Sequence, residues 1–232
     1  MNRRFLLAGA FAATLTCSAA QGQTQTPTQT QIAPQAIELP GVKYPASMNV
    51  ANSNLVLNGA GIRYKFVVKV YTAGLYMGTK ASTPEAVLAT SGPKRVHVVM
   101  LRDIDANELG KLFTRGMQDN APREEFSKSI PGTLRMADIF SAKKKLVAGE
   151  GFSIDFVPGV GTSVLVNGKA QGEPVKEPEF FNALLKIWLG QKPADEQLKN
   201  ALLGKPAETY RSRGQQGRAV TEAVDDGIGF SR

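Results

Sequence analysis

The chain has 232 residues, 42% of them hydrophobic, which suits one ordinary globular domain with additional tails. Its formal net charge is +8, but the basic residues are scattered and no nucleic-acid recognition motif accompanies them, so we expect no nucleic-acid partner. Cys17 is the only cysteine and His97 the only histidine, which excludes a disulfide within one chain and zinc sites of the Cys/His type. A Ser-His-Asp triad would depend on His97, which lies in the strand-like run RVHVVML and is better explained as a half-buried strand residue.

Residues 1–22 have the features of a secretory signal peptide. Arg3 and Arg4 precede the apolar run FLLAGAFAATL, which is too short to span a bilayer, and small residues then place cleavage between about 19 and 23. A lipoprotein leader with Cys17 as the lipidated residue is the alternative. We expect an exported protein, periplasmic in a bacterium with two membranes, with no transmembrane span in the mature chain.

Three further segments follow from composition. Residues 23–36 are rich in Gln, Thr and Pro and predict a disordered linker, because they carry too little apolar surface to offset the entropy of ordering. Residues 37–206 carry the periodic patterns of a folded domain. Residues 207–232 are polar and without periodicity, which predicts a disordered tail.

The first half of the domain predicts strands and one short helix. Residues 48–57 indicate a strand or a hairpin, and residues 61–77 a long strand or a strand pair. A hydroxyl cap followed by Pro84 predicts a helix that ends near Ala89, and residues 95–103 predict another strand.

The second half alternates between helices and a meander. Asp105 and Glu108 form an acidic capping box for a helix with Leu109, Leu112, Phe113 and Met117 on one face. Pro122 opens a further helix, which we expect to be interrupted at Pro131-Gly132 and to resume through Phe140. A three-stranded meander over residues 151–173 turns at Asn167-Gly168.

Two C-terminal helices complete the order of elements, from Pro178 to Gly190 and over about 194–203. Strands and helices are segregated rather than alternating. The pattern therefore predicts an α+β domain, in which helices pack on one side of a mainly antiparallel sheet.

The most strand-like stretch, NGAGIRYKFVVKVYTAGLYM from Asn58 to Met77, holds one conspicuous basic residue. Gly59 and Gly61 open it, and Arg63 follows among β-branched and aromatic residues. A basic side chain in such a strand either faces water or serves a ligand.

Four segments in this order resemble the chalcone isomerase family, in particular its bacterial, exported, chalcone isomerase-like branch. They are GAGIRYKFVVKVYTAGLYM, LRDIDANELGKLFTRG, FVPGVGTSVLVNGKAQG and FFNALLKIWLGQKPADEQLKNALLG. The resemblance spans about residues 40–206. It implies an open-faced β-sandwich with a layer of helices and a ligand cleft between sheet and helices.

The resemblance also implies site residues. The family arginine, which steadies an anion, falls on Arg63, and a family threonine falls on Tyr71. The tyrosine and asparagine of the plant enzymes fall on Phe126 and Thr133, and a phenylalanine has no hydroxyl with which to hold water or a proton. We therefore expect Arg63, Tyr71, Phe126 and Thr133 to contact a ligand, and we identify no catalytic residue apart from Arg63 if the protein is an enzyme.

Three functions remain open. The first is an exported, non-catalytic protein that binds a fatty acid or another small apolar or amphipathic acid, with the apolar helix faces at 109–140 and 180–188 as the wall of the cleft. The second is an intramolecular lyase or isomerase of the chalcone type. The third is a structural or partner-binding domain in which Arg63 pairs with a carboxylate such as Asp103 or Asp105. None of the three implies a cofactor or a metal, and the sequence leaves the oligomeric state open.

Overall fold

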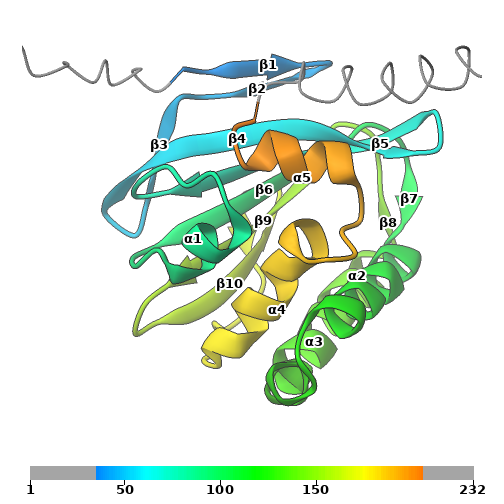
Figure 1. The fold of residues 1–232 in the computed structure, drawn as a ribbon. Coiled ribbons are helices and arrows are strands. Elements are labelled where there is room, and N and C mark those ends of the chain that lie inside the picture. The colour runs from blue at the N-terminus through cyan, green and yellow to red at the C-terminus, as the bar shows by residue number, and fades with distance from the viewer. Residues whose placement is uncertain (1–34, 206–232) are drawn as a thin grey trace, which may run out of the picture. The chain divides into compact units, whose positions relative to one another are not determined.

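A computed structural model describes residues 35–205, and a seven-stranded antiparallel sheet forms its centre (Figure 1). The expected leader and tail and most of the expected linker lie outside the described residues. In spatial order the strands are β11 (Lys169–Ala170), β10 (Gly161–Val166), β9 (Gly151–Val157), β6 (Lys94–Met100), β5 (Val68–Met77), β4 (Ser53–Lys65) and β3 (Ser47–Val50). Two small ribbons accompany this sheet: β1 (Ile37–Leu39) with β2 (Val42–Tyr44), and β7 (Ile104–Asp105) with β8 (Lys145–Leu146).

Tight turns join β3 to β4 and β10 to β11. The β3–β4 turn has positive φ at Ala51 and Asn52, and the β10–β11 turn has positive φ at Asn167 and Gly168. Two successive residues with positive φ are typical of the type I′ turn, whose twist matches that of a hairpin. The expected Asn-Gly turn is confirmed, and the stretch at 61–77 is a strand pair rather than one strand.

Five helices complete the described fold: α1 (Pro84–Ala89), α2 (Ala106–Asn120), α3 (Arg123–Lys143), α4 (Pro178–Leu189) and α5 (Glu196–Leu202). The expected N-cap hydrogen bonds of α1 and α2 are present, while the Glu108 carboxylate of the expected capping box accepts a hydrogen bond from Lys111. The Thr83 hydroxyl accepts a hydrogen bond from the Ala86 N–H at 3.2 Å, and the Asp105 carboxylate accepts one from the Glu108 N–H at 3.0 Å. Each satisfies one of the free N–H groups at a helix start.

The expected interruption at Pro131-Gly132 is wrong, because α3 runs unbroken through both residues. Tertiary packing explains the glycine. A Cβ atom on Gly132 would lie 2.5 Å from the Phe180 ring and 2.7 Å from the Val175 side chain. Gly132 therefore lets α4 approach α3 closely, and this packing outweighs the local preference to end the helix at proline.

The sheet has a core on each face. On one face the helices cover a large core whose centre is a group of edge-to-face rings, with centroids 5.4–6.0 Å apart, from Phe113, Phe140, Phe152 and Trp188. On the other face Tyr44, the buried last residue of β2, packs with Leu55, Leu57 and Tyr76. Helices on one face and a small ribbon on the other give an open-faced sandwich, and the predicted α+β class is confirmed.

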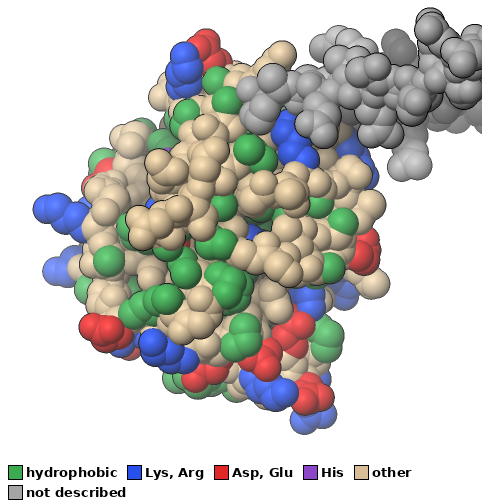
Figure 2. Space-filling view, turned by 90° about the vertical axis from the view of Figure 1, so that its left-hand side faces the viewer, with side chains coloured by type: hydrophobic (Ala, Val, Ile, Leu, Met, Phe, Trp, Pro, Cys, Tyr) green, Lys and Arg blue, Asp and Glu red, His purple; other side chains and the backbone are tan. Residues whose placement is uncertain are grey.

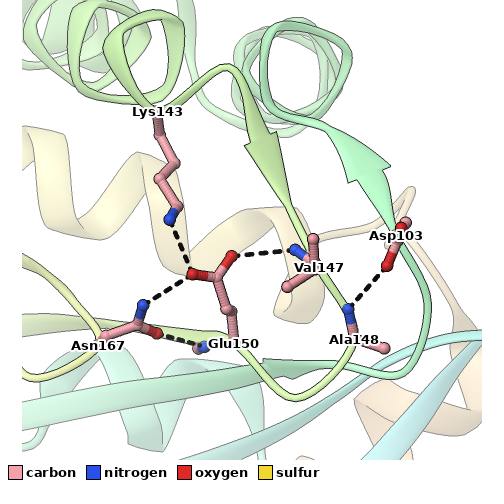
Figure 3. Close-up of polar contacts among 7 residues, drawn as sticks. Asp103, Lys143, Val147, Ala148, Glu150 and Asn167 are labelled. Atoms are coloured by element: carbon pink, nitrogen blue, oxygen red, sulfur yellow. Dashed lines mark hydrogen bonds and ion pairs between the residues drawn. The ribbon is translucent and has the colours of Figure 1, made fainter.

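Polar contacts fix the connection between α3 and β9 (Figure 3). The Glu150 carboxylate pairs with Lys143 at 2.7 Å and accepts hydrogen bonds from the Val147 N–H and the Asn167 amide, both at 3.0 Å. Because these partners favour the charged form, they lower the pKa of Glu150 from its ordinary 4.5 to about 2. Asn167 in turn accepts from the Gly151 N–H at 3.1 Å, so one carboxylate links helix, loop and meander.

Candidate binding cavity

Gly59, Gly61 and Arg63 lie on the helix-covered face of β4. Opposite them across the β4–β5 ladder are Leu75, Ala73 and Tyr71, whose side chains belong to the core beneath the helices. A Cβ atom on Gly59 would lie 2.0 Å from the Ala201 carbonyl oxygen, and one on Gly61 would lie 2.6 Å from the Ala201 Cβ. The two glycines thus let α5 rest directly on the strand, and Arg63 comes immediately after the part of β4 that α5 covers.

Arg63 and Tyr71 face each other as a cross-strand pair. The Arg63 Cζ atom lies over the Tyr71 ring, 5.5 Å from its centroid, which is cation–π geometry. Arg63 is half-buried, while Tyr71 is buried. The ring therefore supports the guanidinium at the edge of the core. Arg63 is neither fully exposed to water nor fully buried in the domain.

The Tyr71 hydroxyl is held from below by Trp188, whose Nε1–H donates to it at 2.9 Å. Burial raises the pKa of Tyr71 to about 12, although Arg63 and the Trp188 hydrogen bond both lower it. The phenol is therefore protonated at neutral pH, and its proton has no acceptor among residues 35–205. Tyr71 is a donor available to a ligand.

A cavity of about 160 Å³ opens at this pair, between the β4–β5 hairpin, α2, the end of α4 and the α4–α5 connection. Its wall is apolar, formed by Leu109, Leu112 and Phe113 of α2 and by Ile187 of α4. Apolar walls with a few convergent polar groups are characteristic of small-molecule sites.

The polar part of the cavity is positively charged. Three cations (Arg63, Arg115 and Lys192) and one carboxylate (Asp119) line it, a balance of +2. Arg115 pairs with Asp119 at 3.6 Å, whereas Arg63 belongs to none of the ion pairs formed within residues 35–205. Low-dielectric walls with positive charge attract a small anion.

Asp195 lies near Tyr71 but is occupied by the backbone. One carboxylate oxygen accepts the Tyr64 N–H at 2.8 Å and the other accepts the Leu198 N–H at 3.0 Å, which caps α5. Neither Asp103 nor Asp105 forms an ion pair with Arg63. Asp103 pairs with Lys145 at 2.7 Å, and Asp105 caps α2, so the expected pairing of Arg63 with one of them is wrong.

Asn120, at the end of α2, fixes the loop that carries Lys192. Its amide donates to the Lys192 carbonyl at 2.9 Å and its carbonyl accepts from the Lys192 N–H at 2.7 Å. The paired bonds hold Lys192 at the cavity rim without involving its ammonium group.

Phe126 and Thr133 do not line this cavity. Phe126 is a partly buried residue of α3 that packs against the main core, and the buried Thr133 hydroxyl donates to the Ser129 carbonyl at 2.9 Å within the same helix. The structure thus brings together two of the four expected ligand contacts, Arg63 and Tyr71. The apolar wall of the cavity is also less extensive than expected over residues 109–140, because α3 contributes no lining residue.

His97 and Lys69 have ordinary surroundings. The His97 Nδ1 lies 2.8 Å from the Ser153 hydroxyl, and burial and the nearby Arg95 lower the pKa of His97. Lys69 is exposed. Within the described residues no group of three or more His, Cys, Asp or Glu side chains is placed to hold a metal ion.

A second hollow, of about 710 Å³, lies along the outer side of α2 and α3. Its lining is mostly polar, including Asn107, Lys111, Thr114, Gln118 and Asp138. Although larger, it has no large hydrophobic side chain in its lining, and it involves neither Arg63 nor Tyr71. A separate face, seen from the left-hand side of Figure 1, carries charged side chains of both signs around its margin, with no continuous patch of one sign (Figure 2).

Comparisons with known proteins identify the family and the fold. Residues 36–204 match the profile of the chalcone isomerase-like family, which is well over half of the chain, so the protein belongs to this family. Among solved structures it is similar to a fatty-acid binding protein of Arabidopsis thaliana, with 15% identity, a TM-score of 0.56, and coverage of 72% of this chain and 95% of that chain. No curated protein sequence matches it. The resemblance and the fold expected from the sequence are confirmed.

The sequence did not predict the roles of Trp188, Arg115 and Lys192. Trp188 lies on the helix face at 180–188 that was expected to line the cleft, but its hydrogen bond to Tyr71, which joins positions 117 residues apart, was not foreseen. None of the helices in the described part of the chain has both the length and the apolar character needed to cross a bilayer.

Proposed function

We propose that the protein binds a fatty acid, or another small apolar molecule with an acidic group, in the cavity beside Arg63. The observation that carries the proposal is a half-buried guanidinium that has no carboxylate partner within residues 35–205 and lies at the mouth of an apolar cavity. The name of the Arabidopsis structure, a fatty-acid binding protein, supports the same ligand class.

In this proposal the ligand carboxylate contacts Arg63 and accepts a hydrogen bond from the Tyr71 hydroxyl. The guanidinium supplies the positive charge, and because the pKa of Tyr71 is raised to about 12, its hydroxyl keeps the proton that it donates. Charge-assisted hydrogen bonds of this kind are about twice as strong as neutral ones. Leu109, Leu112, Phe113 and Ile187 then enclose the first part of the acyl chain.

The size of the cavity limits the ligand. About 160 Å³ is below the range of roughly 300–1,000 Å³ that drug-sized ligands occupy. The cavity holds a carboxylate and a short chain, and a longer chain requires outward movement of a wall residue. Leu112 is the natural one to move, because 44% of its surface is already exposed.

The test is calorimetric titration of a series of saturated fatty acids against the wild type and Arg63→Met. The arginine variant should bind roughly 10- to 100-fold more weakly, the loss expected for one hydrogen-bonded charge. Arg102→Met, which removes an exposed arginine that does not line the cavity, serves as the matched control and should bind as the wild type does.

Two further arms make the titration specific. With the methyl ester of the same acid, the difference between the wild type and Arg63→Met should disappear, because the ester has no charge to hold. Affinity should rise by about 0.8 kcal/mol per added CH₂ until the cavity is full, and then level off. Equal affinity of both proteins for the free acid would overturn the proposal.

We also propose that the protein acts after export, which rests on the leader-like composition of residues 1–22. N-terminal sequencing of the protein from the periplasmic fraction of its host should find a start between about residues 19 and 23. An intact Met1 in the mature protein would contradict export by cleavage, and a lipid on Cys17 would indicate a lipoprotein.

A further inference from the structure

The tip of the β4–β5 hairpin carries hydrophobic side chains where a turn ordinarily carries polar ones. Phe66 and Val67 are 92% and 91% exposed, and the next most exposed large hydrophobic residue in the described part of the chain, Leu134, is 62% exposed. The hairpin projects beyond the helices, at the right of Figure 1. Adjacent apolar side chains this exposed indicate a surface that contacts an apolar partner.

Lysines stand on both sides of the tip. Lys65 and Lys69 are exposed, and neither belongs to an ion pair formed within residues 35–205. Six other lysines of the described part do form ion pairs: Lys43, Lys111, Lys128, Lys143, Lys145 and Lys186. The sequence KFVVK thus presents two exposed apolar side chains with two positive charges at their base, and neither charge is paired within the part of the chain that the structure describes.

The backbone at the tip is strained. Phe66 has φ of 57°, in the left-handed region that glycine favours, and bulky residues rarely adopt it. A two-residue turn with positive φ at its first central position is most easily made with glycine there. A phenylalanine in this place costs folding stability, which is expected when the side chain has a use.

We propose that the β4–β5 hairpin tip docks the protein on a bilayer that contains anionic lipids. Phe66 and Val67 enter the boundary between head groups and acyl chains, where aromatic side chains are favoured. Lys65 and Lys69 contact the lipid phosphates at the surface. A protein partner fits less well, because two protruding side chains offer far less than the roughly 800 Å² per partner of a stable interface.

The docked orientation places the candidate cavity next to the membrane. Arg63 is three residues from Phe66, roughly 10 Å at the rise of a β-strand. If the proposed function holds, an acid could pass between the bilayer and the cavity over that distance. The docking itself needs no bound acid, so it stands or falls independently of the proposed function.

The test is flotation with vesicles of phosphatidylcholine alone or mixed with equal parts of phosphatidylglycerol. All variants are full chains made in the same host, so residues outside the described part contribute equally to each. The double variant Phe66→Ser/Val67→Ser should bind the anionic vesicles at least about tenfold more weakly than the wild type. Leu134→Ser, which removes an exposed leucine from α3, is the matched control and should bind as the wild type does.

A charge arm and a depth arm complete the test. Lys65→Gln/Lys69→Gln should weaken binding to the anionic vesicles roughly 30-fold, at about 1 kcal/mol per lysine, and leave binding to phosphatidylcholine vesicles unchanged, whereas Lys80→Gln/Lys169→Gln should change neither. In Phe66→Trp, lipids brominated in the acyl chain should quench the new fluorescence, while the buried Trp188 stays unquenched.

Each outcome separates the hypotheses. Equal vesicle binding by the wild type and Phe66→Ser/Val67→Ser overturns the proposal. A wild-type dimer in sedimentation velocity that this variant dissolves, without vesicle binding by either, overturns it in favour of a contact between two copies. The tip variant should keep its affinity for a fatty acid in lipid-free buffer, and Arg63→Met should keep its vesicle binding, so loss of either function is assigned to its own site.

Discussion

Replacing Phe66 by glycine should stabilise the protein, although it removes a large hydrophobic side chain. The left-handed backbone conformation destabilises a non-glycine residue by about 1–2 kcal/mol, and glycine removes this cost. Glycine also makes the unfolded chain more flexible, which lowers the free energy of unfolding by about 0.5–1 kcal/mol. Because Phe66 is 92% exposed, almost no buried area is lost. The net gain is about 0.8 kcal/mol, which corresponds to a rise in Tm of about 2–3 °C for a domain of this size.

The neighbouring residue provides a control of opposite sign. Val67 is as exposed as Phe66, but its φ is not positive. Val67→Gly therefore relieves no backbone strain. It only increases the entropy of the unfolded chain, which should lower Tm by about 2 °C. Differential scanning calorimetry of the three proteins at one pH measures both shifts. If Phe66→Gly lowers Tm as Val67→Gly does, the strain argument for the tip is wrong.

Three further predictions concern packing, the buried tyrosine and pH. Gly59→Ala should cost about 1–3 kcal/mol in urea unfolding because its Cβ would meet the backbone of α5, whereas Gly78→Ala, with no atom within 4 Å, should be nearly neutral. Tyr71→Phe should cost about 1–3 kcal/mol because it leaves the Trp188 N–H buried without an acceptor, and the fluorescence of this single tryptophan should report the change. Because the pKa of Glu150 is lowered to about 2, its charged carboxylate stabilises the fold fully above pH 4.5 and loses this effect as it becomes protonated. The difference in unfolding free energy between the wild type and Glu150→Gln should therefore shrink as the pH falls from 4.5 toward 2. A pH-independent difference in urea unfolding would contradict the last prediction.

Local patterns in the sequence predicted most of the fold. Capping residues, the Asn167-Gly168 turn and alternating strands each depend on neighbours within a few positions, and these elements formed as expected. The continuous α3 helix is different, because Gly132 is explained by Phe180, which comes 48 positions later and packs against it. From neighbouring residues alone, such a glycine predicts the end of a helix, because the residue that requires it lies in another helix.

The candidate site was predicted in part for the same reason. Arg63 and Tyr71 lie on one hairpin, so family resemblance and strand register suffice to bring them together. Lys192 reaches the rim through a loop that Asn120 holds, and Trp188 reaches Tyr71 across the core. Neither contact follows from a spacing or a motif. The exposure of Phe66 was equally unpredictable, because a strand of VVKVY type gives no sign of where its hairpin turns.

The β4–β5 hairpin links the two proposals physically. Its strands carry Arg63 and Tyr71 toward the core, while its turn carries Phe66 and Val67 away from it. A bulge between Arg63 and Tyr64 shifts the register at the point where one role gives way to the other. Bulges twist a strand pair locally and change the direction of its side chains. Because of this bulge, the inner residues can face the helices while the side chains at the tip point in another direction. A cavity too small for a long acyl chain and a tip suited to a bilayer are then consistent with one mode of action, in which the protein holds the acidic end of a lipid while the remainder of the chain stays close to the membrane.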